Sequence, residues 1–186
     1  ADFGAEVIKI EPQGGDPGRR IPPLIDAGNG QRESTTFAWL NTNKKSVLAD
    51  PETQSGAEKI LALLATADLL LDARHPDEIK TSRISHDLLR ANDPGLAITA
   101  ISWFGEHGPY RNYQTTDSVC RSLAGLVKLV GPVEGPPVLP RDGQIGVMGG
   151  LTAFIPSLAG LYGHAHGARR FAVNNLEAML HISEFD

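Results

Sequence analysis

The chain has 186 residues, of which 41% are hydrophobic and 21% charged, and its formal net charge is -5. These values predict a globular chain with a core of ordinary size, in the range of one domain or a large part of one. Because binding to a phosphate backbone needs an excess of clustered Lys and Arg, the net acidity argues against a nucleic-acid partner.

The cysteine count and the hydropathy limit the possible cellular compartment, metal sites and membrane partners. The single cysteine, Cys120, excludes an intrachain disulfide and makes a cysteine-based zinc site implausible, so we expect a core residue and a cytoplasmic protein. His164 and His166 lack further ligands at metal-binding spacing, so we expect no metal site. We find no apolar run long enough for a bilayer and no leader-like segment, and therefore expect no membrane partner.

Strands alternate with helices in the first half of the chain, which predicts an α/β fold. Asp50 and Pro51 suit an N-cap and a first helical position, and the apolar residues that follow recur at helical spacing. This buried stripe consists of Ala57, Ile60, Leu61 and Leu64. The strands are expected at residues 7–10, 46–49, 67–71, 96–103 and 169–173. Because the first strand comes almost at once after Ala1, we interpret the chain as truncated.

Two glycine- and proline-rich stretches, residues 12–23 and 131–150, are predicted to be loops. The second carries Glu134 and Asp142, the only acidic residues nearby. Helices are expected at residues 85–91, around 119–126, around 151–158 with a kink at Pro156, and at 176–182. Leu151, Phe154, Ile155 and Leu158 share one face of the third of these helices.

Four segments in order resemble family III acyl-CoA transferases of the CaiB/BaiF type, which include formyl-CoA and carnitine-CoA transferases. The segments are ADFGAEVIKIEPQGGDPGR (1–19), NTNKKS (41–46), ATADLLLD (65–72) and LRANDPGLAITAISWFGEHGPY (89–110). The resemblance implies a Rossmann-like parallel sheet with flanking helices. Residues 1–186 would form part of the family's large domain, with the N-terminal strand and the C-terminal half missing. It also implies an interlocked homodimer in the full-length protein.

The resemblance further implies CoA transfer between an acyl-CoA and a small carboxylic acid, with CoA esters as substrates and no prosthetic group. Family members bind CoA at the ends of the parallel strands. These positions correspond to residues 49–52, 73–75 and 114–117. The candidate contacts are Lys44, Asp50, Arg74, His75, Gln114, Thr116 and Asp117. At the first two positions of residues 73–75 the family commonly has Asn followed by an aromatic residue, where this chain has Ala73 and Arg74.

The catalytic position departs from the family pattern. Family members use an aspartate that attacks the thioester, forming a mixed anhydride and then an enzyme-bound thioester. An ungapped count from Gly135 places this aspartate at Gly146, which has no side chain. Asp142 could replace it only in a rebuilt loop, and a turn role between Arg141 and Gly143 is the competing interpretation.

Three functions therefore stay open. The protein could be an active CoA-transferase with a displaced nucleophile. It could be a catalytically inactive CoA-binding module, or half of a fused or hetero-oligomeric transferase. A structural subunit without CoA affinity is the third possibility. The related CoA-ester racemases use a histidine and an aspartate, but the corresponding positions here are Thr116 and Gly146, which disfavours that reaction.

Overall fold

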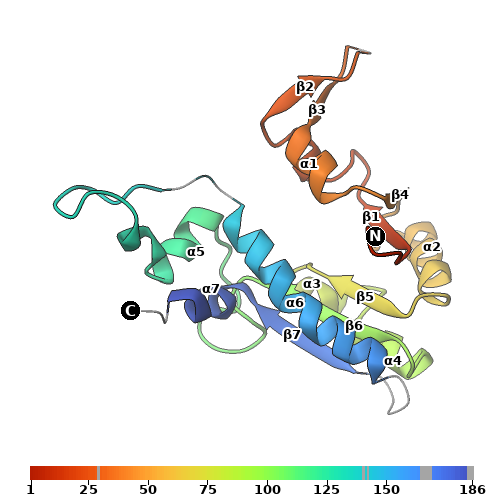
Figure 1. Cartoon of the computed structure of the whole chain (residues 1–186). Coiled ribbons are helices and arrows are strands. Elements are labelled where there is room, and N and C mark those ends of the chain that lie inside the picture. The colour runs from red at the N-terminus through yellow and green to blue at the C-terminus, as the bar shows by residue number, and fades with distance from the viewer. Residues whose placement is uncertain (29, 140, 142, 164–168, 184–186) are drawn as a thin grey trace. The chain divides into compact units, whose positions relative to one another are not determined.

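A computed structural model describes residues 1–28, 30–139, 141, 143–163 and 169–183 (Figure 1). The chain divides into two compact units, residues 1–63 and residues 64–186. Both units contain parallel strand pairs and helices, so the predicted α/β class is confirmed. The description of residues 1–186 as part of a single domain stays a prediction.

The first unit is built on two parallel strands. β1 (Val7–Glu11) pairs with β4 (Lys44–Leu48) from Val7 opposite Lys44 to Glu11 opposite Leu48. Both strands were predicted, and β4 begins two residues earlier than expected. Of the predicted loop at residues 12–23, only a 3-10 helix, η1 (Pro17–Arg20), is regular. The remaining elements before β4 are an antiparallel pair, β2 (Leu24–Asp26) and β3 (Arg32–Ser34), and the helix α1 (Thr35–Leu40).

Glu11 fastens the glycine-rich loop to the end of β1. The side chain is 1% exposed, and its two oxygens accept hydrogen bonds from Nε and Nη2 of Arg19, both at 2.8 Å. Ser46 Oγ and the backbone N–H of Asp16 donate to the same carboxylate. The Arg19 hydrogen bonds, against the opposing effect of burial, lower the pKa of Glu11 to about 2. The loop is therefore held by a buried, ionised acceptor.

α2 (Gln54–Leu64) confirms the predicted apolar stripe, since Ala57, Ile60 and Leu64 are buried. The predicted N-cap at Asp50 is wrong: Thr53 Oγ1 accepts the backbone N–H of Gly56, which places the cap three residues later. The carboxylate of Asp50 instead accepts the N–H of Glu52 within the preceding turn. A Cβ on Gly56 would lie 2.0 Å from the Asp50 carbonyl oxygen, so this close approach requires glycine.

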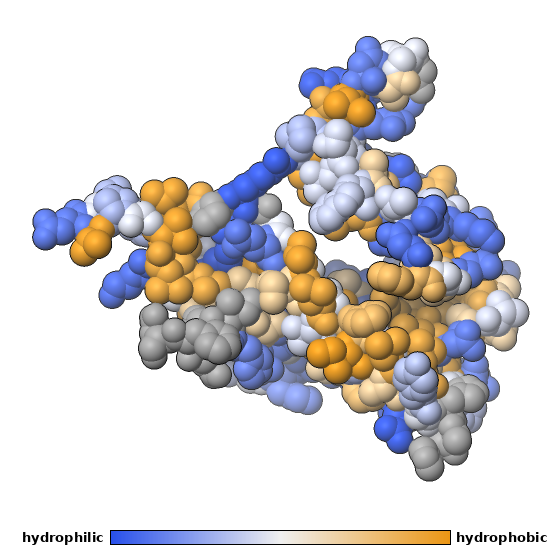
Figure 2. Space-filling view, viewed as in Figure 1, coloured by the Kyte–Doolittle hydropathy of each residue, from blue (hydrophilic) through white to orange (hydrophobic). Residues whose placement is uncertain are grey.

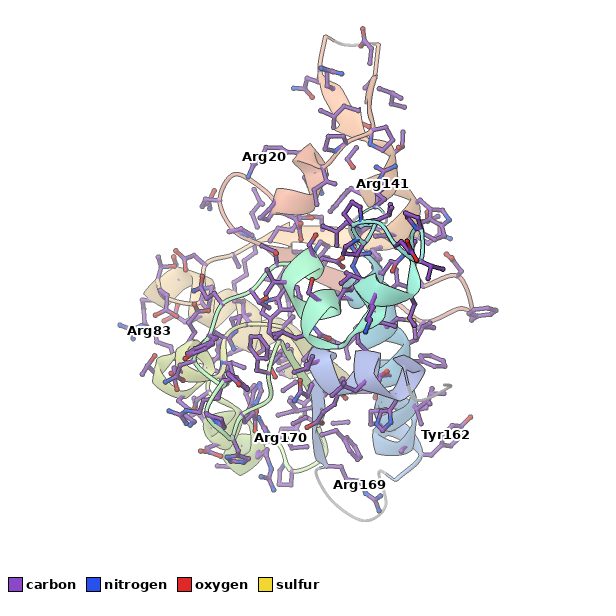
Figure 3. The ribbon with its side chains drawn as sticks, turned by 90° about the vertical axis from the view of Figure 1, so that its left-hand side faces the viewer. Arg20, Arg83, Arg141, Tyr162, Arg169 and Arg170 are labelled. Atoms are coloured by element: carbon purple, nitrogen blue, oxygen red, sulfur yellow. The ribbon has the colours of Figure 1, made fainter. Side chains whose placement is uncertain are left out.

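The second unit contains a three-stranded parallel sheet in the order β5 (Leu69–Asp72), β6 (Ala97–Ser102), β7 (Arg170–Asn174). The first four residues of β6 are buried, as expected of a central strand covered on both faces. α6 (Gln144–Tyr162) crosses one face, and α3 (Pro76–Thr81) and α4 (His86–Asn92) lie on the other (Figures 1 and 3). α5 (Asp117–Leu123), η2 (Leu126–Leu129) and α7 (Asn175–Ser183) complete the unit.

α6 begins at Gln144, so the prediction of a loop up to residue 150 is wrong for its last seven positions. Gly149 faces α7, where a Cβ would lie 2.0 Å from Asn175 Oδ1. Ala153, Ser157 and Gly160 continue this face as a buried row of small residues. The helix thus approaches the sheet and α7 closely because glycine, alanine and serine occupy its inner face.

The opposite face of α6 is apolar and exposed, as Figure 2 shows. Leu151, Phe154, Ile155 and Leu158, the predicted apolar face, are 37% to 72% exposed. The expectation that no apolar segment could span a bilayer was also wrong, because α6 has the length and composition to do so. Such helices also cover sheets in soluble proteins, and the inner face of α6 packs on β6 and β7 in this manner.

Candidate functional site

The junction between α5 and α6 brings together three of the positions singled out from the sequence. Thr116 is the N-cap of α5, and its side chain accepts the backbone N–H of Val119. Asp117 follows, and its Oδ1 accepts the backbone N–H of Ile145 in the first turn of α6 at 2.9 Å. The N-cap of α6 is Gly143, which has no side chain to cap the helix. Asp117 therefore caps α6 from a neighbouring helix.

A buried arginine supports this cap. Arg121 is 1% exposed, and its Nε lies 2.7 Å from Asp117 Oδ2, an ion pair whose atoms are not aligned as a hydrogen bond. Its Nη1 donates to Gln144 Oε1 at 3.4 Å. Ile145 itself is fully buried in a cluster with Cys120, Ala124 and Met179. The first turn of α6 is thus fixed by both charge and packing.

Gly146 lies in this fixed turn and is exposed. Among the described residues, and apart from its chain neighbours and the backbone of α6 itself, no heavy atom lies within 4 Å of the position that a Cβ would take. A carboxylate there would have room, and the N-terminal end of a helix favours negative charge. The position expected to carry the nucleophile is therefore well placed but has no side chain. Asp142, the candidate replacement, lies outside the described residues.

Arg74 and His75, predicted CoA contacts, follow β5. Arg74 forms a bidentate pair with Asp72, with its Nη2 2.7 Å from Oδ2, and also donates to Ser82 Oγ and to the Ile84 carbonyl oxygen. His75 is the N-cap of α3, where its Nδ1 accepts the backbone N–H of Asp77. These bonds give both side chains a structural role, and their contact with CoA stays a prediction.

Asp72 belongs to a buried polar network that sequence reasoning missed. Burial disfavours its charged form, but hydrogen bonds from His86 and Arg74 hold the pKa of Asp72 well below its usual range. His86, 4% exposed, places Nε2 3.0 Å from Asp72 Oδ2, and its Nδ1 accepts a hydrogen bond from Arg170 Nε at 3.0 Å. His86 is therefore assigned as the neutral ring with its proton on Nε2.

Arg170 closes the network by pairing with Glu106 through both terminal nitrogens, with Nη1 2.9 Å from Oε2. The Arg170 hydrogen bond lowers the pKa of Glu106, against burial. These residues come from β5, α4, β7 and the turn after β6. No local motif connects them, so nothing in the sequence pattern could have identified the network.

Two of the remaining predicted contacts, Lys44 and Asp50, lie at opposite ends of β4 in the first unit. Lys44 begins β4, where its Nζ donates to the Leu40 carbonyl oxygen and to Asn41 Oδ1. Burial, followed by the nearby charge of Lys9, lowers the pKa of Lys44. Asp50 follows the other end of β4, so the strand separates the two side chains. Gln114 is exposed and precedes α5.

Metal-ligating side chains do not gather in the part of the chain that the structure describes: no group of three or more His, Cys, Asp or Glu could hold an ion. His164 and His166 lie outside the described residues.

Comparison with known proteins gives consistent findings. Residues 1–185 match the sequence profile of CoA-transferase family III. The alpha subunit of succinyl-CoA–L-malate CoA-transferase from Chloroflexus aurantiacus is 36% identical over 165 residues, 87% of this chain and 36% of that protein. A probable CoA-transferase of Mycobacterium tuberculosis is 37% identical over 143 residues, covering 77% of this chain and 17% of its own.

Among solved structures, a CaiB/BaiF family protein from Brucella suis superposes with a TM-score of 0.90 at 27% identity. The match covers 98% of this chain and 49% of that one. The chain thus spans about half the length of the solved protein and about a third or less of the two relatives named above.

Proposed function

The chain belongs to CoA-transferase family III, and on this premise we propose that the protein takes part in CoA transfer between an acyl-CoA donor and a carboxylic acid acceptor. Proteins similar to this chain over most of its length are named as CoA-transferases acting on succinyl-CoA. An acyl-CoA and a small carboxylic acid are the proposed substrates, and no prosthetic group is required. The reaction breaks one thioester and forms another, so acceptor and donor exchange CoA without net hydrolysis.

The first turn of α6 indicates which part of this reaction the chain itself performs. Gly146 occupies it with open space in place of a side chain. The family's mechanism needs a carboxylate that attacks the thioester carbon, and glycine supplies none. We therefore propose that this chain binds acyl-CoA as the non-catalytic half of a fused or hetero-oligomeric transferase. Two similar proteins are named as subunits of CoA-transferases, which supports this assignment.

An active enzyme with Asp142 as nucleophile is the competing candidate. It requires the segment before α6 to present that carboxylate to the thioester in place of residue 146. Racemisation has less support, because Thr116, at the position of the racemase histidine, serves as the N-cap of α5. The racemases also need a carboxylate, and the corresponding position is again Gly146, which has no side chain.

The outer face of α6 supports the proposal of an assembly. Phe154 and Ile155 are 57% and 72% exposed, and a contiguous apolar face of this kind is typical of a surface that another protein segment covers. We propose that the full-length protein forms the interlocked dimer implied by its family. We also propose a cytoplasmic location, which a free, buried Cys120 suits.

Titration calorimetry combined with a transfer assay tests the function. We expect CoA and acyl-CoA to bind, while CoA transfer by this chain alone stays at background. Turnover by the wild-type chain would favour the Asp142 mechanism. Absence of binding by both ligands would leave the structural subunit as the remaining assignment.

A further inference from the structure

A buried histidine connects α4 to two strands of the sheet in the second unit. His86, the first residue of α4, is 4% exposed. Its Nε2 lies 3.0 Å from Asp72 Oδ2 at the end of β5, and its Nδ1 lies 3.0 Å from Nε of Arg170, the first residue of β7. Figure 3 labels Arg170. These two hydrogen bonds, which we call the His86 bridge, thus join strands that are not neighbours in the sheet.

Arg170 determines which form of the ring the bridge accepts. A guanidinium offers only N–H donors and keeps its charge in proteins, so Nδ1 of His86 must be the acceptor. A carboxylate accepts, so Nε2 must carry the ring proton towards Asp72. A second proton, on Nδ1, would place two N–H groups and two positive charges against each other. The bond between His86 and Arg170 therefore exists only while the ring is neutral.

The charged groups around the neutral ring are balanced. Asp72 pairs with Arg74 after β5, and Glu106, in the turn after β6, pairs with Arg170 of β7. Further charged side chains from α3 and α4 line the cleft beside the ring: Lys80, Asp87 and Arg90. Uptake of a proton adds one positive charge, which Asp72 stabilises at Nε2 and Arg170 opposes at Nδ1. A charged ring therefore keeps Asp72 and releases Arg170.

Solvent reaches the ring without unfolding of the unit. His86 lines a cleft of about 230 Å³ between α3, α4 and the start of β7. Histidine is also the side chain that ordinarily changes charge between about pH 5 and pH 8. A titratable ring and a path for the proton are thus combined at one position.

We propose that the His86 bridge is a proton-sensitive switch that joins α4 to β7 when the ring is neutral and releases β7 when the ring is charged. In the released form Arg170 stays paired with Glu106, and His86 stays paired with Asp72. The helix itself stays docked, because Leu89 of α4 is buried in the core. The released form therefore differs at the edge of the cleft, where His86 and Arg170 no longer hold each other.

A permanent structural bridge is the competing explanation. A buried histidine in such a bridge satisfies two buried partners and keeps one protonation state throughout the pH range in which the protein is folded. It predicts the same two hydrogen bonds at pH 8 but no change on acidification. The two explanations differ in what happens to the ring and to Arg170 as the pH falls.

Nuclear magnetic resonance of the full chain between about pH 8 and pH 5 follows both halves of the bridge. The nitrogen chemical shifts of the His86 ring report which nitrogens are protonated. Solvent exchange of the Arg170 Nε–H, expressed as a protection factor relative to the intrinsic rate at each pH, reports its hydrogen bond. We expect Nδ1 of His86 to gain a proton and the protection factor to fall roughly tenfold over the same pH interval.

Two variants assign the response to the ring. His86→Gln does not titrate, but its amide offers one donor and one acceptor as the neutral ring does, so we expect constant protection of Arg170. His107→Gln is the matched control, because His107 is exposed and its charge acts on the same Glu106 carboxylate. We expect the wild-type response in this control. Circular dichroism at each pH confirms that the chains are folded.

The wild-type titration decides between the two explanations even if His86→Gln does not fold. A ring whose Nδ1 stays unprotonated down to about pH 5 refutes the switch. So does a ring that gains the proton while the protection of Arg170 stays unchanged. An equal loss of protection in His86→Gln and in the wild-type chain, or the absence of any response in His107→Gln, would also overturn the proposal.

Discussion

The buried carboxylate of Glu11 gives a prediction whose size follows from the structure. Replacing it by glutamine removes the charge that Arg19 pairs with and disturbs the bonds from Ser46 and Asp16. A pKa lowered from 4.5 to about 2 corresponds to about 3 kcal/mol in favour of the folded unit. Because Arg19 is 46% exposed, solvent screening reduces our expectation to about 2 kcal/mol.

The pH dependence follows from the direction of this shift. The folded-state pKa of Glu11 is below the unfolded value, so its contribution is fully present above pH 4.5 and is lost as the pH falls towards about 2. We expect Glu11→Gln to destabilise β1 and β4 by about 2 kcal/mol at pH 7 and by about 0.5 kcal/mol at pH 2.5. Hydrogen exchange of the β1 and β4 amides measures these opening free energies.

Glu6→Gln is the matched control for Glu11→Gln. Glu6 pairs with Lys45, but both side chains are about two-thirds exposed, so we expect a change below about 0.5 kcal/mol at either pH. An equal effect of Glu11→Gln at pH 7 and pH 2.5 would refute the role of its ionised form. So would a Glu6→Gln effect as large as that of Glu11→Gln.

Two further predictions concern α6. Gly149→Ala should lower the thermal midpoint because its Cβ would strike Asn175. Gly150→Ala should raise stability by up to about 1 kcal/mol, because among the described residues nothing outside its own helix backbone and chain neighbours lies within 4 Å of the new Cβ. Equal effects of the two alanines would contradict the packing described for this face. Asp117→Ala should speed hydrogen exchange at Ile145, whose N–H it accepts, by roughly five- to tenfold for a lost cap of about 1 to 1.4 kcal/mol. Unchanged exchange there would show that α6 does not depend on this cap.

Local sequence patterns predicted the elements that depend only on residues close together in the sequence. The strands and the α2 stripe depend on periodicity within a few residues, and burial of Ala57 and Ile60 follows from it. The start of α6 could not be predicted in this way, because its glycines indicate a loop. Asp117, 28 residues earlier, caps the helix, and contact with Asn175 requires glycine at position 149.

The candidate site likewise contains residues that the sequence predicted and residues that only the folded structure brings together. Resemblance pointed to Thr116, Asp117 and Gly146, and the structure brings them together at one helix junction. The resemblance could not reveal that Asp117 caps α6, because the sequence predicted a later start for this helix. The network of Asp72, His86, Glu106 and Arg170 joins residues up to 98 positions apart in the sequence, so only the folded chain shows it.

Trapping of an acyl-enzyme tests most directly whether this chain binds CoA esters without supplying the nucleophile. The wild-type chain, Gly146→Asp and the control Gly150→Asp are each incubated with acyl-CoA, treated with hydroxylamine or borohydride, and examined by mass spectrometry of the peptide around residue 146. We predict acyl-CoA binding but no modified carboxylate in the wild-type chain or the control, and a modified residue 146 in Gly146→Asp. A modified carboxylate in the wild-type chain, at Asp142 or elsewhere, would contradict the account.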